Sequence, residues 1–233
     1  MFSDARYPTT IENVYLKVAN VSVGSHGGAI VGRLQADQGT SGFKTEDDAL
    51  IKNVVVEDST VTCASSTYGC GGVVGWVKGY GARVVNAEVR GLHLEGTGLC
   101  GGIAGRSEGK TNANYYDNYP WTLALLKNTH VTGGSSLTCE GKNLGGIVGV
   151  SKGTIIAQSK IDSSTSLLGH KHTSSGVSMP SLGSMTGGCN DNTVFETMAN
   201  ENTNCTGLTP WIVVPDKECT YYDQTDYAYL TGT

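Results

Sequence analysis

The hydrophobic positions along this chain follow a short motif that recurs five times. An aliphatic residue is followed by any residue, an asparagine, two further residues and a second aliphatic residue. The five copies begin at Ile11, Ile51, Val84, Leu126 and Ile156, and in the fifth copy a glutamine replaces the asparagine. Such a repeat predicts a stack of similar coils, because one coil cannot bury its aliphatic side chains alone.

A second motif, a double glycine followed by aliphatic residues, accompanies the first. It reads GGAIVG from Gly27, CGGVVG from Cys70, CGGIAG from Cys100 and GGIVG from Gly145, with a degenerate GGC at Gly187. We expect each double glycine at a tight corner where the neighbouring coil approaches closely, since a Cβ atom would obstruct both. The aliphatic residues that follow would re-enter the core as the next strand.

The chain between a double glycine and the next aliphatic motif is alternately long and short. The separations are 24 residues (51 − 27), 13 (84 − 71), 25 (126 − 101) and 11 (156 − 145). Fixed motifs with variable insertions predict an all-β fold, a parallel β-helix or β-solenoid of about five coils with long loops at one corner. Because the repeat ends near residue 187, we expect a solenoid domain over 1–186 and an irregular C-terminal cap or docking segment over 187–233.

Stacked coils place equivalent residues directly above one another. The first aliphatic residues of the motif would form an inward column, and the asparagines would form a hydrogen-bonded ladder. In the alternative interpretation the asparagines only occupy corner positions with left-handed backbone geometry. Both interpretations require the same fold and concern the same residues, which are Asn13, Asn53, Asn86 and Asn128.

The seven cysteines include no C-x-x-C pair, so they favour disulfides in an oxidising compartment over a zinc site. Cys70 and Cys100 precede equivalent glycines, and we predict that they are axial neighbours joined by a disulfide or at least in contact. Cys63 and Cys139, in the similar contexts VTC and LTC, form a weaker candidate pair. The remaining disulfide candidates, in the C-terminal region, are Cys205 and Cys219.

Charge and motifs remove several function classes. The formal net charge is −5 without a basic run, which gives nucleic-acid binding little support. No apolar run reaches the roughly 18 residues of a membrane span, so we expect no membrane insertion. The chain has no His-Glu-x-x-His segment and no Gly-x-Ser-x-Gly elbow, and we expect no metal, no cofactor and no catalysis. Two N-glycosylation sequons agree with secretion, at Asn20 and Asn204.

Aromatic residues crowd the second long insertion and the corner before it. Stacked coils could place them on one exposed strip, which would suit sugar stacking or a protein interface. Alternatively, the loop folds back and buries them as a satellite core. The candidate ligand-binding residues are Trp76, Tyr80, Tyr115, Tyr116, Tyr119 and Trp121.

The segment GGIVG, preceded by a strand and followed by SKGTI, resembles the GLUG-type repeats of bacterial surface proteins. The resemblance covers residues 11–165 and implies a right-handed β-helical stack in an adhesin-like chain. Such repeats also accompany immunoglobulin-cleaving metallopeptidase domains, but no residues of that peptidase have a counterpart in this chain.

These observations favour a non-catalytic structural or adhesive β-solenoid at the cell surface, outside the cell or on a virion. We expect self-association, end to end into a filament or surface layer, or binding to neighbouring surface proteins. The alternative is a glycan-binding surface or a viral receptor-binding module. A polysaccharide lyase or hydrolase comes third, since it would need paired carboxylates on a groove.

Overall fold

The computed structural model describes residues 2–36, 49–64, 69–79, 81–109, 124–140, 143–152, 154–162, 164–169 and 194–195. Within these ranges every regular element is a β-strand, and all the strand pairs are parallel. The predicted all-β class is therefore confirmed. The predicted loop residues of the long insertions, and nearly all of the expected cap over 187–233, lie outside the described residues.

The strands form four parallel sheets. Sheet A contains β1 (Phe2–Arg6), β5 (Val31–Gln35), β9 (Val74–Lys78), β13 (Ala104–Glu108) and β17 (Val148–Lys152). Sheet B contains β2 (Thr9–Lys17), β6 (Ala49–Glu57), β10 (Arg83–Arg90), β14 (Ala124–Thr132), β18 (Thr154–Ala157), β19 (Lys160–Ile161) and β21 (Val194–Phe195).

Two further sheets are made of shorter strands. Sheet C contains β3 (Asn20–Val23), β7 (Thr60–Cys63), β11 (His93–Gly96), β15 (Ser136–Cys139) and β20 (Ser166–Gly169). Sheet D contains β4 (Gly27–Gly28), β8 (Cys70–Gly71), β12 (Leu99–Gly101) and β16 (Asn143–Gly145).

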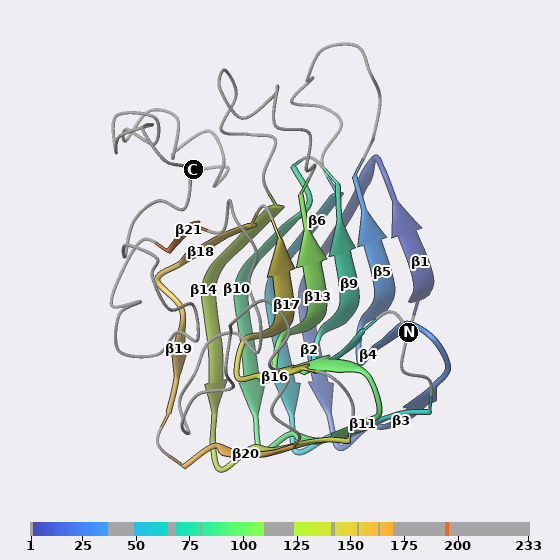
Figure 1. The fold of residues 1–233 in the computed structure, drawn as a ribbon. Helices are drawn as coiled ribbons and strands as arrows, with labels where there is room; N and C mark the ends of the chain where they lie inside the picture. Colours follow the sequence, from blue (N-terminus) through green and yellow to red (C-terminus); the bar gives the residue numbers. More distant parts are fainter. Residues whose placement is uncertain are drawn as a thin grey trace.

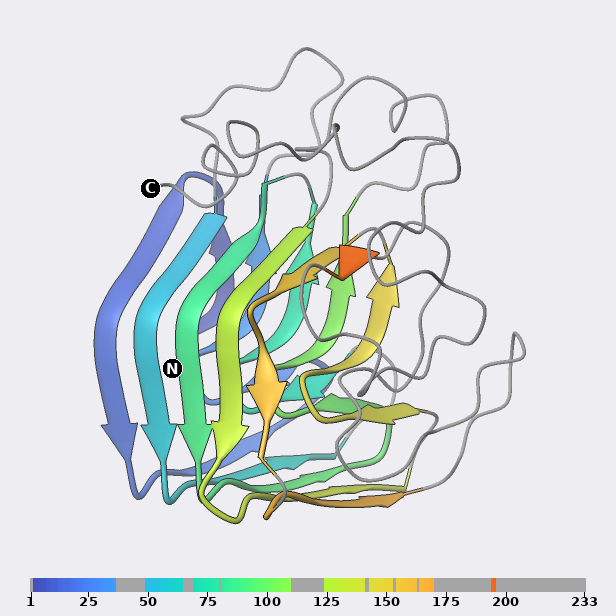
Figure 2. The same ribbon diagram turned by 90° about the vertical axis from the view of Figure 1, so that its left-hand side faces the viewer.

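The chain visits the sheets in a constant order. It passes from sheet A to B, C and D and then returns to A, and each pass adds one strand beside its predecessor in the same sheet (Figures 1 and 2). We call one such pass a winding. Because sheets A and C each have five strands, the structure contains about as many windings as the sequence motif has copies.

The variable insertions all join sheet A to sheet B. The connections between them comprise residues 36–48, 79–82, 109–123 and 153. They are alternately long and short, as the spacing of the motifs predicts, and each follows a strand of sheet A and precedes a strand of sheet B. The strands of sheet B that follow these connections keep the register of the motif, since Ile11 pairs with Ile51 and Ile51 with Val84.

The core is built from columns of equivalent aliphatic side chains. The first aliphatic positions of the motif lie in register on neighbouring strands of sheet B, as predicted. Ile51, Val84 and Leu126 are fully buried, whereas Ile11, in the first winding, is only partly buried. Each fully buried aliphatic side chain contributes about 1.5–3 kcal/mol, so several such columns stabilise the stack.

The asparagine column combines the two features that the sequence left as alternatives. Asn53 Nδ2 donates to Asn13 Oδ1 at 3.1 Å, Asn86 Nδ2 to Asn53 Oδ1 at 3.0 Å, and Asn128 Nδ2 to Asn86 Oδ1 at 2.8 Å. All four residues also have a positive φ, between 50° and 58°, and so does Gln158 at 50°. The left-handed backbone at this point within each sheet B strand therefore lets each amide donate to the asparagine of the preceding winding, which extends the ladder.

The double glycines are required by the close approach of neighbouring windings. A Cβ atom on Gly72 would lie 2.2 Å from the carbonyl oxygen of Gly102, and one on Gly102 would lie 2.2 Å from that of Gly146. Gly102 and Gly146 are also joined by a backbone hydrogen bond of 3.0 Å. Any side chain at these positions would push the windings apart.

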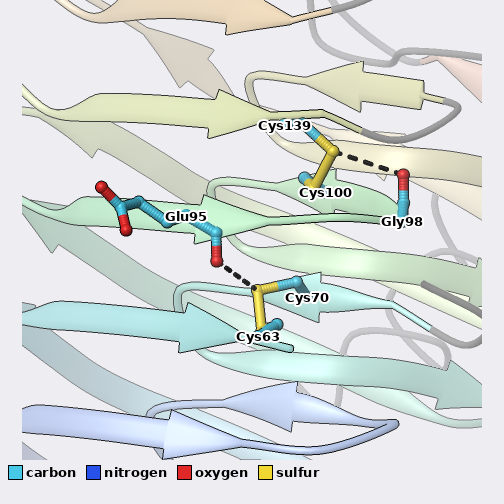
Figure 3. Close-up of a disulfide and its surroundings, with 6 residues drawn as sticks. All are labelled: Cys63, Cys70, Glu95, Gly98, Cys100 and Cys139. Atoms are coloured by element: carbon cyan, nitrogen blue, oxygen red, sulfur yellow. Dashed lines mark hydrogen bonds between the residues drawn. A yellow bond between two sulfur atoms is a disulfide. The ribbon is translucent and has the colours of Figure 1, made fainter. Parts of the chain in front are cut away.

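Cys70 and Cys100 are axial neighbours in register on β8 and β12, as predicted. The disulfide expected between them is wrong, and so is the weaker candidate pair of Cys63 with Cys139. The disulfides instead join Cys63 to Cys70 and Cys100 to Cys139, with Cα–Cα distances of 6.0 and 6.1 Å (Figure 3). Parallel neighbours in register hold their Cβ atoms about 4.8 Å apart, whereas a disulfide needs about 3.8 Å. The bonds therefore form across the corner between sheets C and D.

Gly96 explains why the second disulfide crosses from one winding to the next. It occupies in its winding the place that Cys63 and Cys139 occupy in theirs. A Cβ atom there would lie 2.7 Å from Cys100 Sγ. Cys100 thus has no cysteine opposite it in its own winding and bonds to Cys139 in the next one.

Figure 3 also marks two contacts between disulfide sulfurs and backbone oxygens. Cys70 Sγ lies 3.9 Å from the carbonyl oxygen of Glu95, and Cys139 Sγ lies 3.3 Å from that of Gly98. A disulfide sulfur carries no hydrogen, so we regard both as packing contacts rather than hydrogen bonds.

Candidate functional site on the outer face of sheet A

The outer face of sheet A carries a cluster of charged side chains around one tryptophan. Along β5, β9 and β13 the inward residues Leu34, Val77 and Ser107 are fully buried, so the residues on either side of them point outward. We call this surface the sheet A face, and its members are Asp4, Arg6, Arg33, Gln35, Trp76, Lys78, Arg106 and Glu108.

The members of the sheet A face form two rows that run across the strands. Asp4, Arg33, Trp76 and Arg106 lie in register in one row. The second row contains Arg6, Gln35, Lys78 and Glu108. Each of β1, β5, β9 and β13 therefore contributes one cationic side chain, and these alternate between the rows.

Trp76 is the centre of this cluster. Its ring is stacked on the His26 ring, with the centroids 5.4 Å apart and the planes 7° from parallel. Lys78 Nζ lies 4.5 Å and Arg106 Cζ 4.9 Å from the indole centroid. Cation–π attraction of this kind contributes about 0.5–1 kcal/mol at exposed sites and holds a long side chain in one place.

Ion pairs fix the two ends of the sheet A face. Arg33 Nε donates to Asp4 Oδ1 at 3.0 Å, and its NH2 group donates to Asp4 Oδ2 at 2.6 Å. At the other end Arg106 donates to Glu108 at 2.8 Å. None of the ion pairs found among the described residues involves Lys78. Its ammonium group is therefore the cation of this face that forms no direct ion pair with a described carboxylate, although Glu108 is its neighbour in register on β13.

Two pKa shifts reflect the electrostatics of the sheet A face. The hydrogen bond from Arg33, together with the Arg6 guanidinium, lowers the pKa of Asp4 to about 2, against the effect of burial. Burial is the main cause of the lowered pKa of His26, and the positive charge of Arg33 adds to it. The face therefore holds Asp4 ionised and disfavours a further positive charge on His26.

Sheet B carries a second charged cluster, in which the carboxylates are already engaged. Lys17 Nζ lies 2.5 Å from a Glu57 oxygen, and an Arg90 nitrogen lies 2.6 Å from a Glu88 oxygen. The hydrogen bond from Lys17 lowers the pKa of Glu57, and that from Arg90 lowers the pKa of Glu88. A glycoside hydrolase needs a carboxylic acid with a raised pKa, so neither glutamate suits that role.

Of the candidate ligand-binding residues of the aromatic strip, the structure describes Trp76. Trp76 is 8% exposed, with Lys78 and Arg106 over its ring, so it offers little open ring surface to a sugar, and the long insertion that the alternative invokes lies outside the described residues. The other members lie outside the described residues; they are Tyr80, Tyr115, Tyr116, Tyr119 and Trp121. Sequence reasoning missed the cationic residues around Trp76, because the position directly after the double-glycine motif differs between copies, with arginine at Arg33 and Arg106 but tryptophan at Trp76.

The remaining predicted sites are only partly described. Asn20 and Ser22 of the first sequon are exposed on β3, at the edge of sheet C. Cys205, Cys219 and Asn204 lie outside the described residues.

The described part of the chain contains no group of three or more His, Cys, Asp and Glu side chains placed to hold a metal ion. Among the described residues no helix has the length and apolar character of a membrane span.

Comparison of the chain with protein-family models, with curated proteins and with solved structures finds no match in any of the three. The resemblance to GLUG-type repeats therefore stays a prediction.

Proposed function

We propose that this chain is a β-solenoid that acts outside the cell, at a cell or virion surface, as a non-catalytic structural or adhesive module. The observation that carries the proposal is the register of successive windings. The asparagine ladder continues through four windings, and equivalent aliphatic side chains stack beneath it. A structure built this way extends along one axis, because each winding contacts only its neighbours, as suits an elongated scaffold.

The two disulfides support an oxidising location. Cys63, Cys70, Cys100 and Cys139 are all 2% exposed or less; the first bond lies within one winding and the second joins the next two, both at the corner between sheets C and D. Such bonds form and persist in secreted and surface proteins and are rare in reducing compartments. Peptide mapping of non-reduced protein purified from its native source tests this. Free thiols at these four positions would contradict the extracellular assignment.

End-to-end association is the second part of the proposal, and the first winding supports it. Ile11, Val14 and Leu16 are only partly buried there, although their equivalents in the next winding are fully buried. Phe2 and Tyr15 in the same winding are 57% and 58% exposed. Parallel strand edges with an apolar end surface favour addition of further strands from another copy.

Light scattering over a range of protein concentrations tests the association. We expect the mass of the wild-type particle to grow with concentration. The variant Val14→Lys places a charge in the end surface and should remain monomeric. Thr10→Lys adds the same charge to an exposed position on the outer face of sheet B in the same winding and should still associate. A strictly monomeric wild-type protein would refute this part of the proposal.

A further inference from the structure

We infer that the sheet A face binds a linear acidic polysaccharide, one that carries sulfate or carboxylate groups, along the axis of the stack. The inference adds a ligand to the proposed surface role and does not require end-to-end association.

The first step is charge. Four cations and two carboxylates lie on the sheet A face, so its net charge is positive, whereas the whole chain has a formal net charge of −5. One of these cations, Lys78, lies between the two ends that Asp4 and Glu108 neutralise. A positive surface on an acidic protein attracts anions locally and repels them elsewhere, which directs an anionic ligand to this face.

The second step is geometry. Neighbouring strands are about 4.8 Å apart, so four cations on four consecutive strands span about 14 Å in a zigzag line. A polysaccharide with one acidic group on each sugar or on every second sugar presents negative charges at comparable intervals. Nucleic acid carries a charge about every 1.7 Å as a duplex and about every 3.4 Å along a single strand, densities that an acidic protein repels more strongly.

The third step is that contacts within the protein hold the cationic side chains in place before a ligand binds. Trp76 holds Lys78 and Arg106 against its ring, and Asp4 holds Arg33 through two hydrogen bonds. Arg33 uses two of its N–H groups in that pair, so the others remain available to a ligand. Side chains that are already ordered lose little entropy on binding, which favours affinity. In this arrangement the buried Trp76 positions the cations and does not itself stack on a sugar.

Isothermal titration calorimetry at low salt tests the inference. The probes are heparin as the sulfated polymer, polygalacturonate as the carboxylated polymer, dextran as the neutral polymer and single-stranded poly(dT) as the nucleic acid. We expect at least one acidic polysaccharide to bind, with an affinity that falls as salt increases, and we expect dextran not to bind. Which of the two acidic polymers binds more tightly identifies the preferred acidic group.

Matched variants localise the site. Lys78→Gln should weaken binding about tenfold, the effect of removing one charged contact. Lys78→Arg should restore most of the affinity, because it keeps the charge beside Trp76. Lys52→Gln removes the same charge from the outer face of sheet B, where Lys52 pairs with Glu12, and should change the affinity less than twofold. Circular dichroism and thermal unfolding of each variant verify that the fold is intact.

Three results would overturn the inference. These are no binding of either acidic polysaccharide to the wild-type protein, an equal loss in Lys52→Gln and Lys78→Gln, and tighter binding of poly(dT) than of both polysaccharides. Light scattering of the same samples without polymer reports association separately, so failure of the binding site and failure of the proposed assembly are distinguishable.

Discussion

The asparagine ladder makes a prediction that separates its hydrogen bonds from the backbone geometry of the corner. Asn86 donates to Asn53 and accepts from Asn128, whereas Asn13, at the end of the ladder, only accepts from Asn53. Glycine adopts the positive φ of these positions at no steric cost. The substitutions Asn86→Gly and Asn13→Gly therefore keep the corner and remove two hydrogen bonds and one, respectively.

The expected magnitudes follow from this count. Each hydrogen bond contributes about 0.5–1.5 kcal/mol net, toward the lower end for exposed groups that water can satisfy. Glycine also increases the entropy of the unfolded chain, by a similar amount in both variants. We expect Asn86→Gly to lower the free energy of unfolding by about 2 kcal/mol and Asn13→Gly by about 1 kcal/mol.

Urea unfolding, followed by far-UV circular dichroism under non-reducing conditions, measures both changes. Asn53→Gly is the control for fraying of the first winding. It removes two hydrogen bonds, as Asn86→Gly does, but lies one winding closer to the end. If the residues serve only the corner, all three glycine variants will have similar stability, or will even be stabilised. That result would refute the ladder as an energetic contribution.

Two further predictions test the packing and the charges. Gly102→Ala should lower the free energy of unfolding by about 3 kcal/mol or more in thermal unfolding, because its Cβ atom would lie 2.2 Å from a backbone oxygen. The control is Gly24→Ala, which should have little effect because no atom lies within 4 Å of its Cβ position. The lowered pKa of Asp4, about 2 against an ordinary 3.8, gives stability that is present above pH 4 and is lost as pH falls through 2. Because Asp4 is partly exposed, we expect a loss of about 1 kcal/mol in urea unfolding between pH 4 and pH 2, and Asp4→Asn should lack this loss.

The stacking of windings could be predicted from the sequence because the core imposes it. Every winding must bury an aliphatic side chain at the same place, so Ile51, Val84 and Leu126 recur in the same motif and lie in one column. The left-handed backbone at the third position of the motif restricts the residue there in a similar way, which is why asparagine recurs at Asn53 and Asn86. The motif thus repeats in the sequence because each winding packs its residues in the same way.

The disulfide pairing could not be predicted in this way, because it depends on residues that face one another across a corner. The motif places Cys70 and Cys100 in one column, but a disulfide needs Cβ atoms closer together than in-register strands provide. The deciding residue is Gly96, which belongs to the opposite column and does not stand out in the sequence. Register predicts which residues are neighbours, and corner geometry decides which of them bond.

The candidate site follows from the same distinction between the inside and the outside of the stack. Inward positions must be buried and have their polar groups paired in every winding, whereas outward positions are freer to differ, so an outer face can acquire chemistry without disturbing the core. On sheet A the outward row changes from Asp4 to Arg33, Trp76 and Arg106 over four strands. The inward column beside it consists of Ala5, Leu34 and Val77, which are apolar, and Ser107, which is buried and accepts a hydrogen bond from Thr154. Folding therefore does not require that each of β1, β5, β9 and β13 carry a cation. This is the physical reason for assigning binding to sheet A and stability to the columns beneath it.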